Sequence, residues 1–345
     1  MQQASAFRHI LQGSAIAFSC ALVLASCGAE ADSGDTGKVR MTVEASAIPA
    51  FVAADRGFFD GIDVEVSEVG YDEVQSLLVS GDTDVAWISP LEAAQFVAEG
   101  EEFKYFSTAG AQNMYNGVVV RAEDASTYAS IGDLQGKRLG IPGFGTGTWT
   151  AFEAFTKAYY GIDDPRSAFD IVTADSGALL ALVERGEVDA ALLFSGTSAA
   201  ARSLPEFHTI FSFTEAMQEE AGQPLVVNGS VSTAQWLEDN PDAAASVVEG
   251  LDEATRWIQD NPDAFSEGAE YASLAKAAGW LEGPETTSTV QTLIGEGKWF
   301  LTSDAFSEEW IDAIFELVEA GEGSIVTEVP ERDRVFLAPG TLTAG

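Results

Sequence analysis

The sequence predicts an α/β fold built as two units, in which short buried strands alternate with amphipathic helices. Three observations support this prediction. The chain has 345 residues, which is more than one compact core usually holds. Apolar residues make up 46% of it, enough to fill a sizeable core. Short apolar runs alternate with segments of helical periodicity from Lys38 onward, which is typical of layered α/β proteins.

The first predicted unit begins with a strand and adds strands and helices in turn. Gly81 and Gly100 follow helical segments, where a left-handed residue commonly ends a helix. We expect strands at residues 39–45, 64–69, 85–88 and 103–108, and helices at 48–59, 71–80 and 91–98.

The second predicted unit begins near Asn116, and the chain then returns to the first. We expect its strands at 117–121, 138–141, 169–172, 188–194 and 207–213, and its helices at 148–160 and 177–185. Residues 225–228 look like a strand that leads back to the first unit. After Ser232 the pattern is helical, and Asn240-Pro241 and Asn261-Pro262 each carry the Asn and Pro expected at a helix start.

The charge of the chain is strongly negative. There are 55 Asp and Glu against 17 Lys and Arg, which gives a formal net charge of −38. Nucleic acid is excluded as a partner because no basic stripe is present to neutralise phosphates. We interpret the acidity as a solvated surface suited to halophilic, salty surroundings, where repulsion is screened, and keep attraction of a cationic ligand as the alternative.

The N-terminus predicts export and attachment to a membrane. A polar start with Arg8 is followed by an apolar run at 15–24, which is too short to span a bilayer and fits a signal peptide at 1–26. Leu24-Ala25-Ser26-Cys27 resembles a bacterial lipobox, which implies lipidation of Cys27. Residues 27–37 are small and polar, as a flexible tether requires. The expected location is therefore the extracytoplasmic face of the cell membrane.

Four motifs follow one another along the chain: Arg56-Gly57-Phe58-Phe59, Thr83-Asp84-Val85-Ala86, Ile131-Gly132-Asp133-Leu134-Gln135-Gly136-Lys137-Arg138 and Arg185-Gly186-Glu187-Val188-Asp189-Ala190. In this order they resemble motifs of the substrate-binding proteins of ABC transporters, in the SsuA/THI5-like (NMT1) family. The resemblance implies a type II periplasmic-binding-protein fold, with two crossing strands as a hinge and a ligand cleft between two lobes. It implies lobe one at 38–115 plus 229–345, lobe two at 116–228, a monomer, and permease and ATPase subunits as partners.

The candidate site is nominated by sheet topology. In open α/β sheets, ligands lie beyond the carboxyl ends of the strands, where loops lead into helices. The strongest such loop is Gly143-Phe144-Gly145-Thr146-Gly147-Thr148-Trp149, which follows a strand and opens a helix with free N–H groups. The alternative for each polar residue is a helix cap without ligand contact. The ligand-binding residues that we expect are Ser46, Trp87, Ser89, Asn113, Tyr115, Gly145, Thr146, Gly147, Thr148, Trp149, Asp175, Ser195 and Asn228.

The residue types in these loops narrow the ligand only partly. Aromatic rings near the rim favour a planar organic molecule, since flat ligands stack on ring faces. The loops nominated by sheet topology are residues 45–47, 88–90, 109–113, 143–149, 175–176 and 194–197. None of them contains Arg or Lys, which argues against an anion site that depends on charge alone. Sulfonates, nitrate- and taurine-like molecules, aromatic acids and planar heterocycles all stay open.

Catalysis has few candidate residues, so we expect a binding protein and no enzyme, cofactor or metal. After signal removal only His208 remains as a histidine, and the body has no cysteine other than the lipidated one. The chain lacks the Asp-x-Asp-x-Asp-Gly spacing of a calcium loop. A lipid-anchored sensory protein is one alternative, and a THI5-like enzyme of pyrimidine synthesis is another.

Overall fold

The computed structural model describes residues 38–281 and 283–342, which belong to one compact unit, Gly37–Gly345. The predicted signal peptide, Cys27 and the tether lie outside these residues. No described helix is long and apolar enough to cross a bilayer.

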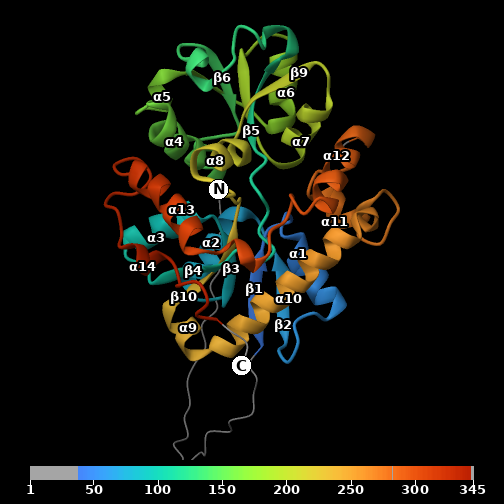
Figure 1. Ribbon diagram of the computed structural model, residues 1–345, viewed down its shortest axis with the longest axis vertical. Helices are drawn as coiled ribbons and strands as arrows, with labels where there is room; N and C mark the ends of the chain where they lie inside the picture. The colour runs from blue at the N-terminus through green and yellow to red at the C-terminus, as the bar shows by residue number, and fades with distance from the viewer. Residues whose placement is uncertain (1–37, 282, 343–345) are drawn as a thin grey trace, which may run out of the picture. The chain divides into compact units, whose positions relative to one another are not determined.

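Two five-stranded mixed sheets form the framework (Figure 1). The first has the order β2-β1-β3-β10-β4, with β1 Val39–Val43, β2 Val64–Glu68, β3 Val85–Ile88, β4 Phe103–Ser107 and β10 Gly229–Thr233. The second has the order β7-β6-β8-β5-β9, with β5 Gly117–Arg121, β6 Arg138–Ile141, β7 Asp170–Thr173, β8 Ala190–Leu193 and β9 Phe207–Ser212.

The two sheets repeat one pairing scheme. β1 is parallel to β2 and β3, as β6 is to β7 and β8. β10 runs antiparallel between β3 and β4, and β5 does the same between β8 and β9. Each sheet thus has one interior strand, next to an edge, that runs antiparallel to both of its neighbours and is not consecutive in sequence with the strand on its inner side.

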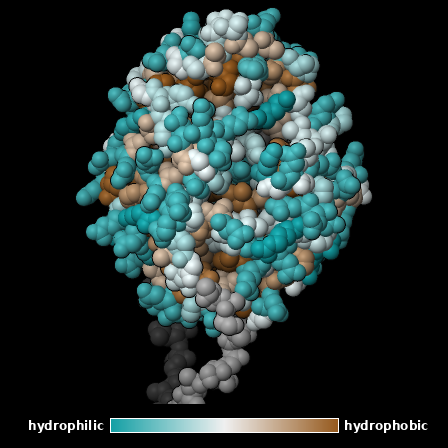
Figure 2. Space-filling view, viewed as in Figure 1, coloured by the Kyte–Doolittle hydropathy of each residue, from teal (hydrophilic) through white to brown (hydrophobic). Residues whose placement is uncertain are grey.

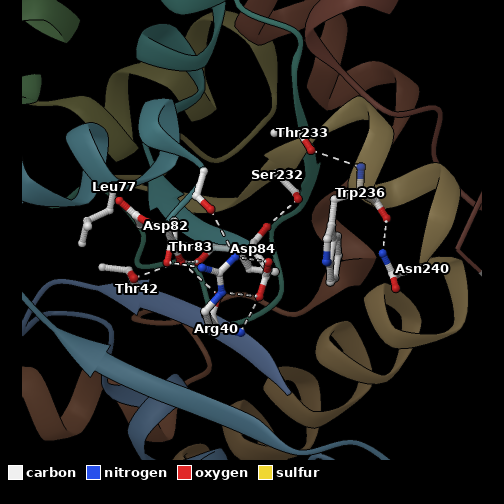
Figure 3. Close-up of polar contacts among 12 residues, drawn as sticks. Arg40, Thr42, Leu77, Asp82, Thr83, Asp84, Ser232, Thr233, Trp236 and Asn240 are labelled. Atoms are coloured by element: carbon white, nitrogen blue, oxygen red, sulfur yellow. Dashed lines mark hydrogen bonds and ion pairs between the residues drawn. The ribbon is translucent and has the colours of Figure 1, made fainter. Parts of the chain in front are cut away.

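An arginine–aspartate pair fixes the start of the first parallel strand in each sheet. Arg40 donates from its backbone N–H to Asp84 at 2.7 Å and from its guanidinium to both carboxylate oxygens (Figure 3). Arg138 binds Asp189 in the same way, with 2.9 Å for the backbone contact. Asp84 stands immediately before β3 and Asp189 immediately before β8, so the two pairs fix the register of β1 with β3 and of β6 with β8.

Helices cover the sheets, and most begin and end at residues of the expected type. Ser89 opens α3 with a capping box, Ser307 caps α13, and Gly81 ends α2 in the left-handed conformation. The helices that pack with the first sheet's segments are α1 Ile48–Arg56, α2 Tyr71–Ser80, α3 Pro90–Glu99, α9 Ala234–Asp239, α10 Pro241–Asp260, α11 Ala272–Ala277, α12 Pro284–Gly295, α13 Glu308–Ala320 and α14 Arg332–Val335. Those between β6 and β10 are α4 Gly147–Tyr160, α5 Pro165–Ala168, α6 Ser176–Glu184, α7 Ser195–Ser203 and α8 Phe213–Ala221.

Apolar side chains fill the space between helices and sheets, and the described core includes Trp87, Trp149 and Trp299, all fully buried. Figure 2 shows hydrophilic residues over most of the visible face, with apolar residues in scattered patches. This agrees with the acidic composition, since charged residues are almost never fully buried unless they are paired.

One expectation about local structure is wrong. The returning strand is not 225–228 but β10, where Ser230 and Ser232 are buried between two neighbouring strands. Polar residues at such a position hide an interior strand from a hydrophobicity pattern. Asn240 and Asn261 stand at helix N-cap positions with Pro next in the chain, as predicted, but their side chains do not donate or accept the capping hydrogen bond. Their side-chain amides donate instead to the carbonyls of Trp236 and Trp257, in the last turns of the preceding helices.

Candidate functional site

A pocket of about 460 Å³ lies where loops of both sheets converge. Three of its segments follow parallel strands at their carboxyl ends: Glu44–Ser46 after β1, Gly145–Thr148 after β6, and Phe194–Thr197 after β8. This is the edge at which α/β sheets bind ligands. The other segments lie beside β5 and β10 or after α11. The lining residues are Glu44, Ala45, Ser46, Gln112, Met114, Asn116, Gly145, Thr146, Gly147, Thr148, Phe194, Gly196, Thr197, Val227, Ala277, Ala278 and Gly279.

The glycine loop is held in place by its own threonine. Thr146 caps α4: its hydroxyl accepts from the Trp149 N–H at 3.2 Å and donates to the Gly143 carbonyl at 3.0 Å. Thr148 accepts from the side-chain amide of Asn116 at 2.9 Å. The loop therefore presents Gly145 and two threonines to the pocket on a rigid backbone.

Glu44 contributes the charge of the pocket. One carboxylate oxygen, Oε1, accepts from the hydroxyl of Ser46 at 2.8 Å and from the amide of Asn228 at 2.9 Å. Burial raises the pKa of Glu44, and the nearby Glu92 carboxylate raises it further, while the two hydrogen bonds lower it; burial is the largest cause. No described Lys, Arg or His forms an ion pair with Glu44.

Gln112 is the most buried amide of the lining. Its side chain is 1% exposed, and its Oε1 has no hydrogen-bond partner among the described residues. Its backbone carbonyl accepts from Val227 at 2.8 Å, which joins two segments of the lining. A buried amide oxygen without a partner is costly, so this atom is an unsatisfied acceptor in a residue of the lining.

The structure brings five of the predicted residues to the pocket. Asn228 is fully buried and does not line the pocket, but it contacts Glu44. The side chain of Ser195 is outside the described part of the structure. The five lining residues are Ser46, Gly145, Thr146, Gly147 and Thr148.

The other predicted residues have structural contacts away from the pocket. Ser89 caps α3, and Asp175 is exposed before α6. Asn113 is buried and binds the Lys298 carbonyl and the hydroxyl of Thr214. Their polar groups serve capping and packing in the structure, which is the alternative that the sequence left open.

The expected stacking platform is also absent from the lining. Trp87 and Trp149 are 0% exposed, and Tyr115 stacks on Trp299 with ring centroids 5.5 Å apart. Large rings near strand ends are taken up by the core here. Phe194, at 39% exposed, is the aromatic side chain that the described lining does contain.

Several lining residues were not singled out from the sequence. Ala45, Gln112, Phe194, Gly196 and Thr197 lie in nominated loops, whereas Glu44 directly follows β1, one residue before such a loop. An acid directly after a strand was the available signal for Glu44. Met114, Asn116, Val227 and 277–279 gave none, because they lie in crossovers and after a C-terminal helix whose position depends on the whole fold.

Acid–base and metal chemistry have little support in the described residues. These contain no cluster of three or more His, Cys, Asp or Glu that could hold a metal. His208 lies on the exposed side of β9 and is not among the lining residues. The arrangement offers hydrogen bonds, one carboxylate and apolar contacts, which suit reversible binding.

Two sheets of identical order with a pocket at their facing loops define a two-lobed α/β protein of the periplasmic-binding-protein class, as predicted. The chain belongs to the NMT1/THI5-like family, whose model matches residues 44–265. A comparison with curated proteins finds no match.

Solved structures share the fold at low identity. The periplasmic aliphatic sulphonate binding protein SsuA from Escherichia coli has 13% identity and a TM-score of 0.65, over 89% of this chain and 94% of that one. The ligand binding component of an ABC-type import system from Staphylococcus aureus, with zinc bound, has 10% identity and a TM-score of 0.60, over 89% of this chain and 99% of that one. The alkanesulfonate-binding protein SsuA from Xanthomonas axonopodis pv. citri, bound to MOPS, has 14% identity and a TM-score of 0.55, over 87% of this chain and 98% of that one.

Proposed function

We propose that this protein is the solute-binding component of an ABC importer and captures a small organic molecule between two lobes. The observation that carries the proposal is the pocket of about 460 Å³, to which loops of both sheets contribute. Pockets of this size hold small organic ligands, and a few polar groups in a mostly apolar lining fix their orientation.

Closure of the lobes is the proposed mechanism of capture. The lobes of the proposal are 38–115 plus 229–345 and 116–228, and the chain passes between them at Asn116 and Asn228. Support comes from helix pairs that join the two, since α4 packs on α13 and α7 packs on α12. A ligand that touches both sets of loops favours the closed arrangement over the open one.

The remaining parts of the proposal concern place and partners. A signal peptide at 1–26 and lipidation of Cys27 would hold the protein on the extracytoplasmic face of the membrane. A permease and an ATPase would then take up the solute. The fold shared with the E. coli and Xanthomonas binding proteins and with the ligand binding component of the S. aureus import system supports this assignment. The absence of His and Cys from the described lining favours binding over a THI5-like catalytic role.

The glycine loop provides the test. Gly145 lines the pocket, and a Cβ at this position would meet no atom within 4 Å, so Gly145→Leu should fold normally and occupy ligand space. We expect a panel of small organic cations and anions to contain compounds that raise the melting temperature of the wild type, and that this rise disappears in Gly145→Leu.

Gly177→Leu is the matched control, because Gly177 lies on the exposed side of α6 with equally open space and is not in the lining. Both variants should keep the unliganded stability within about 0.5 kcal/mol. An undiminished shift in Gly145→Leu would remove the pocket as the binding site. Turnover of a bound compound would replace the receptor assignment with an enzymatic one.

A further inference from the structure

The charge of the pocket has one sign. Glu44 is the only ionisable side chain among the described lining residues, and neither Lys, Arg nor His is present there. A sulfonate or nitrate placed in this pocket would meet a carboxylate and no cation. An anionic ligand is therefore disfavoured by the electrostatics of the lining.

The carboxylate of Glu44 is held so that one oxygen stays available. Oε1 accepts hydrogen bonds from the side chains of both Ser46 and Asn228, and no described side chain donates to Oε2. The described ion pairs of the molecule do not include Glu44, although most of its acids with restricted exposure have a basic partner, such as Asp84 with Arg40. A partly buried carboxylate without a counter-charge is unfavourable unless a ligand supplies one.

A second acceptor lies in the same lining. The Oε1 atom of Gln112 is buried and lacks a partner, while the side chains of Met114, Phe194 and Val227 provide apolar contact. The pocket thus combines a fixed negative group, an unsatisfied amide oxygen and an apolar wall. These are the contacts that an organic molecule with a charged nitrogen at one end requires.

We propose that the solute is a small organic cation whose N–H groups donate to the free carboxylate oxygen of Glu44, with Gln112 as a further acceptor. This rests on the proposed function, since it names the ligand class of the same pocket. The net charge of −38 acts in the same direction, because a negative protein raises the local concentration of cations and their rate of association.

The test uses three probes that share one ring and differ in charge: benzamidine, benzoate and benzenesulfonate. Their affinities are measured by isothermal titration calorimetry for the wild type, Glu44→Gln and Glu319→Gln. Glutamine can keep the two hydrogen bonds to Oε1 and exposes an N–H₂ in place of the free oxygen. Glu319 is exposed on α13, outside the lining and the described ion pairs, so its variant has the same change in net charge.

We expect benzamidine to bind the wild type and Glu319→Gln alike, and Glu44→Gln at least about tenfold more weakly, as loss of a charge-assisted hydrogen bond requires. Benzoate and benzenesulfonate should bind the wild type more weakly than benzamidine. Equal binding of benzamidine by Glu44→Gln, or tighter binding of the anions by the wild type, would overturn the cation assignment and leave the binding function standing. Failure of all three probes to bind would overturn both.

A measurement on the wild type alone covers the case in which Glu44→Gln does not fold. Benzamidine stays charged at mildly acidic pH, so its affinity should fall as the pH is lowered through the raised pKa of Glu44. The groups that act on this carboxyl are Ser46, Asn228 and Glu92. An affinity that stays constant or rises on acidification would contradict the proposal.

Discussion

Glu44 is a residue at which burial and ionisation oppose each other. Its carboxylate stands at the end of a buried strand, with two donors on one oxygen and Glu92 as the neighbouring charge. Because burial disfavours the ionised form, the folded protein binds a proton at Glu44 more tightly than the unfolded chain does.

This gives a pH dependence with a defined sign. With the folded pKa raised above its ordinary value of 4.5, the stabilisation that protonation of Glu44 provides is complete below that value and is lost as the pH rises through the folded pKa. Glu44→Gln lacks this titration. We therefore expect it to be more stable than the unliganded wild type at neutral pH, by a margin that shrinks on acidification. Urea denaturation across this range measures the margin, and a variant that is less stable by the same amount at every pH would contradict the prediction.

The sequence located part of the site at this scale. The glycine loop was found because a strand, a run of glycines and a helix start follow one another. That pattern places the loop at the carboxyl end of a strand, on the edge where α/β sheets bind ligands. Trp87 and Trp149 were misplaced because a ring near a strand end can point to the core or to the rim, and a single sequence does not distinguish them. Glu44 was overlooked because its importance comes from the absence of a cation nearby, which depends on segments such as 277–279.

Two strands, β5 and β10, carry the same local design. Each is preceded by a buried Asn and opens with Gly: Asn116-Gly117 and Asn228-Gly229. Each Asn donates at 2.9 Å to a pocket residue after the first parallel strand of its sheet, Asn116 to Thr148 and Asn228 to Glu44. Each strand also has an irregular register after its second residue. Hydrogen bonds from the residues that precede β5 and β10 thus hold two of the pocket loops.

The glycines of these strands permit close approach of neighbouring chain segments. A Cβ on Gly117 would lie 2.2 Å from the Phe211 carbonyl oxygen, and one on Gly229 would lie 1.8 Å from the Tyr105 hydroxyl. We expect Gly117→Ala and Gly229→Ala each to lower the free energy of unfolding by about 1–3 kcal/mol, as overpacking does. Gly145→Ala, which meets open space, should show no such loss in the same denaturation experiment. Tolerance of both strand substitutions would mean that the sheets open locally more easily than the structure indicates.

At this scale the sequence predicted the parallel strands well and the interior antiparallel strand of the first sheet, β10, poorly. β5 is apolar along its length and was recognised. β10 reads Gly-Ser-Val-Ser-Thr, and its serines are buried only because strands flank it on both sides. Neighbours supplied by distant segments are not visible in a local pattern.

In the molecule as a whole, helices from either side of the pocket meet. Ser203 on α7 and Thr289 on α12 join their hydroxyls at 3.1 Å, and Lys157 on α4 donates to the Glu322 carbonyl beyond α13 at 2.9 Å. A further close approach is at Gly196, where a Cβ would lie 2.3 Å from the Gly279 carbonyl oxygen. Both glycines line the pocket.

A side chain at residue 196 should therefore push α7 and the segment at Gly279 apart. We expect Gly196→Val to bind ligand roughly 5- to 150-fold more weakly, as a packing penalty of about 1–3 kcal/mol implies, and to show a larger radius of gyration with ligand by X-ray scattering. Gly177→Val on the exposed side of α6 is the control. Wild-type affinity and compaction in Gly196→Val would argue against closure at this contact.

The route of the chain through its sheets has a consequence for synthesis. All strands of the second sheet come from one uninterrupted stretch, Gly117 to Ser212, whereas β4 meets its own sheet only through β10, which is made more than a hundred residues later. A growing polypeptide can thus finish the later sheet while the earlier one still lacks the strand between β3 and β4. The half that is made first is completed last.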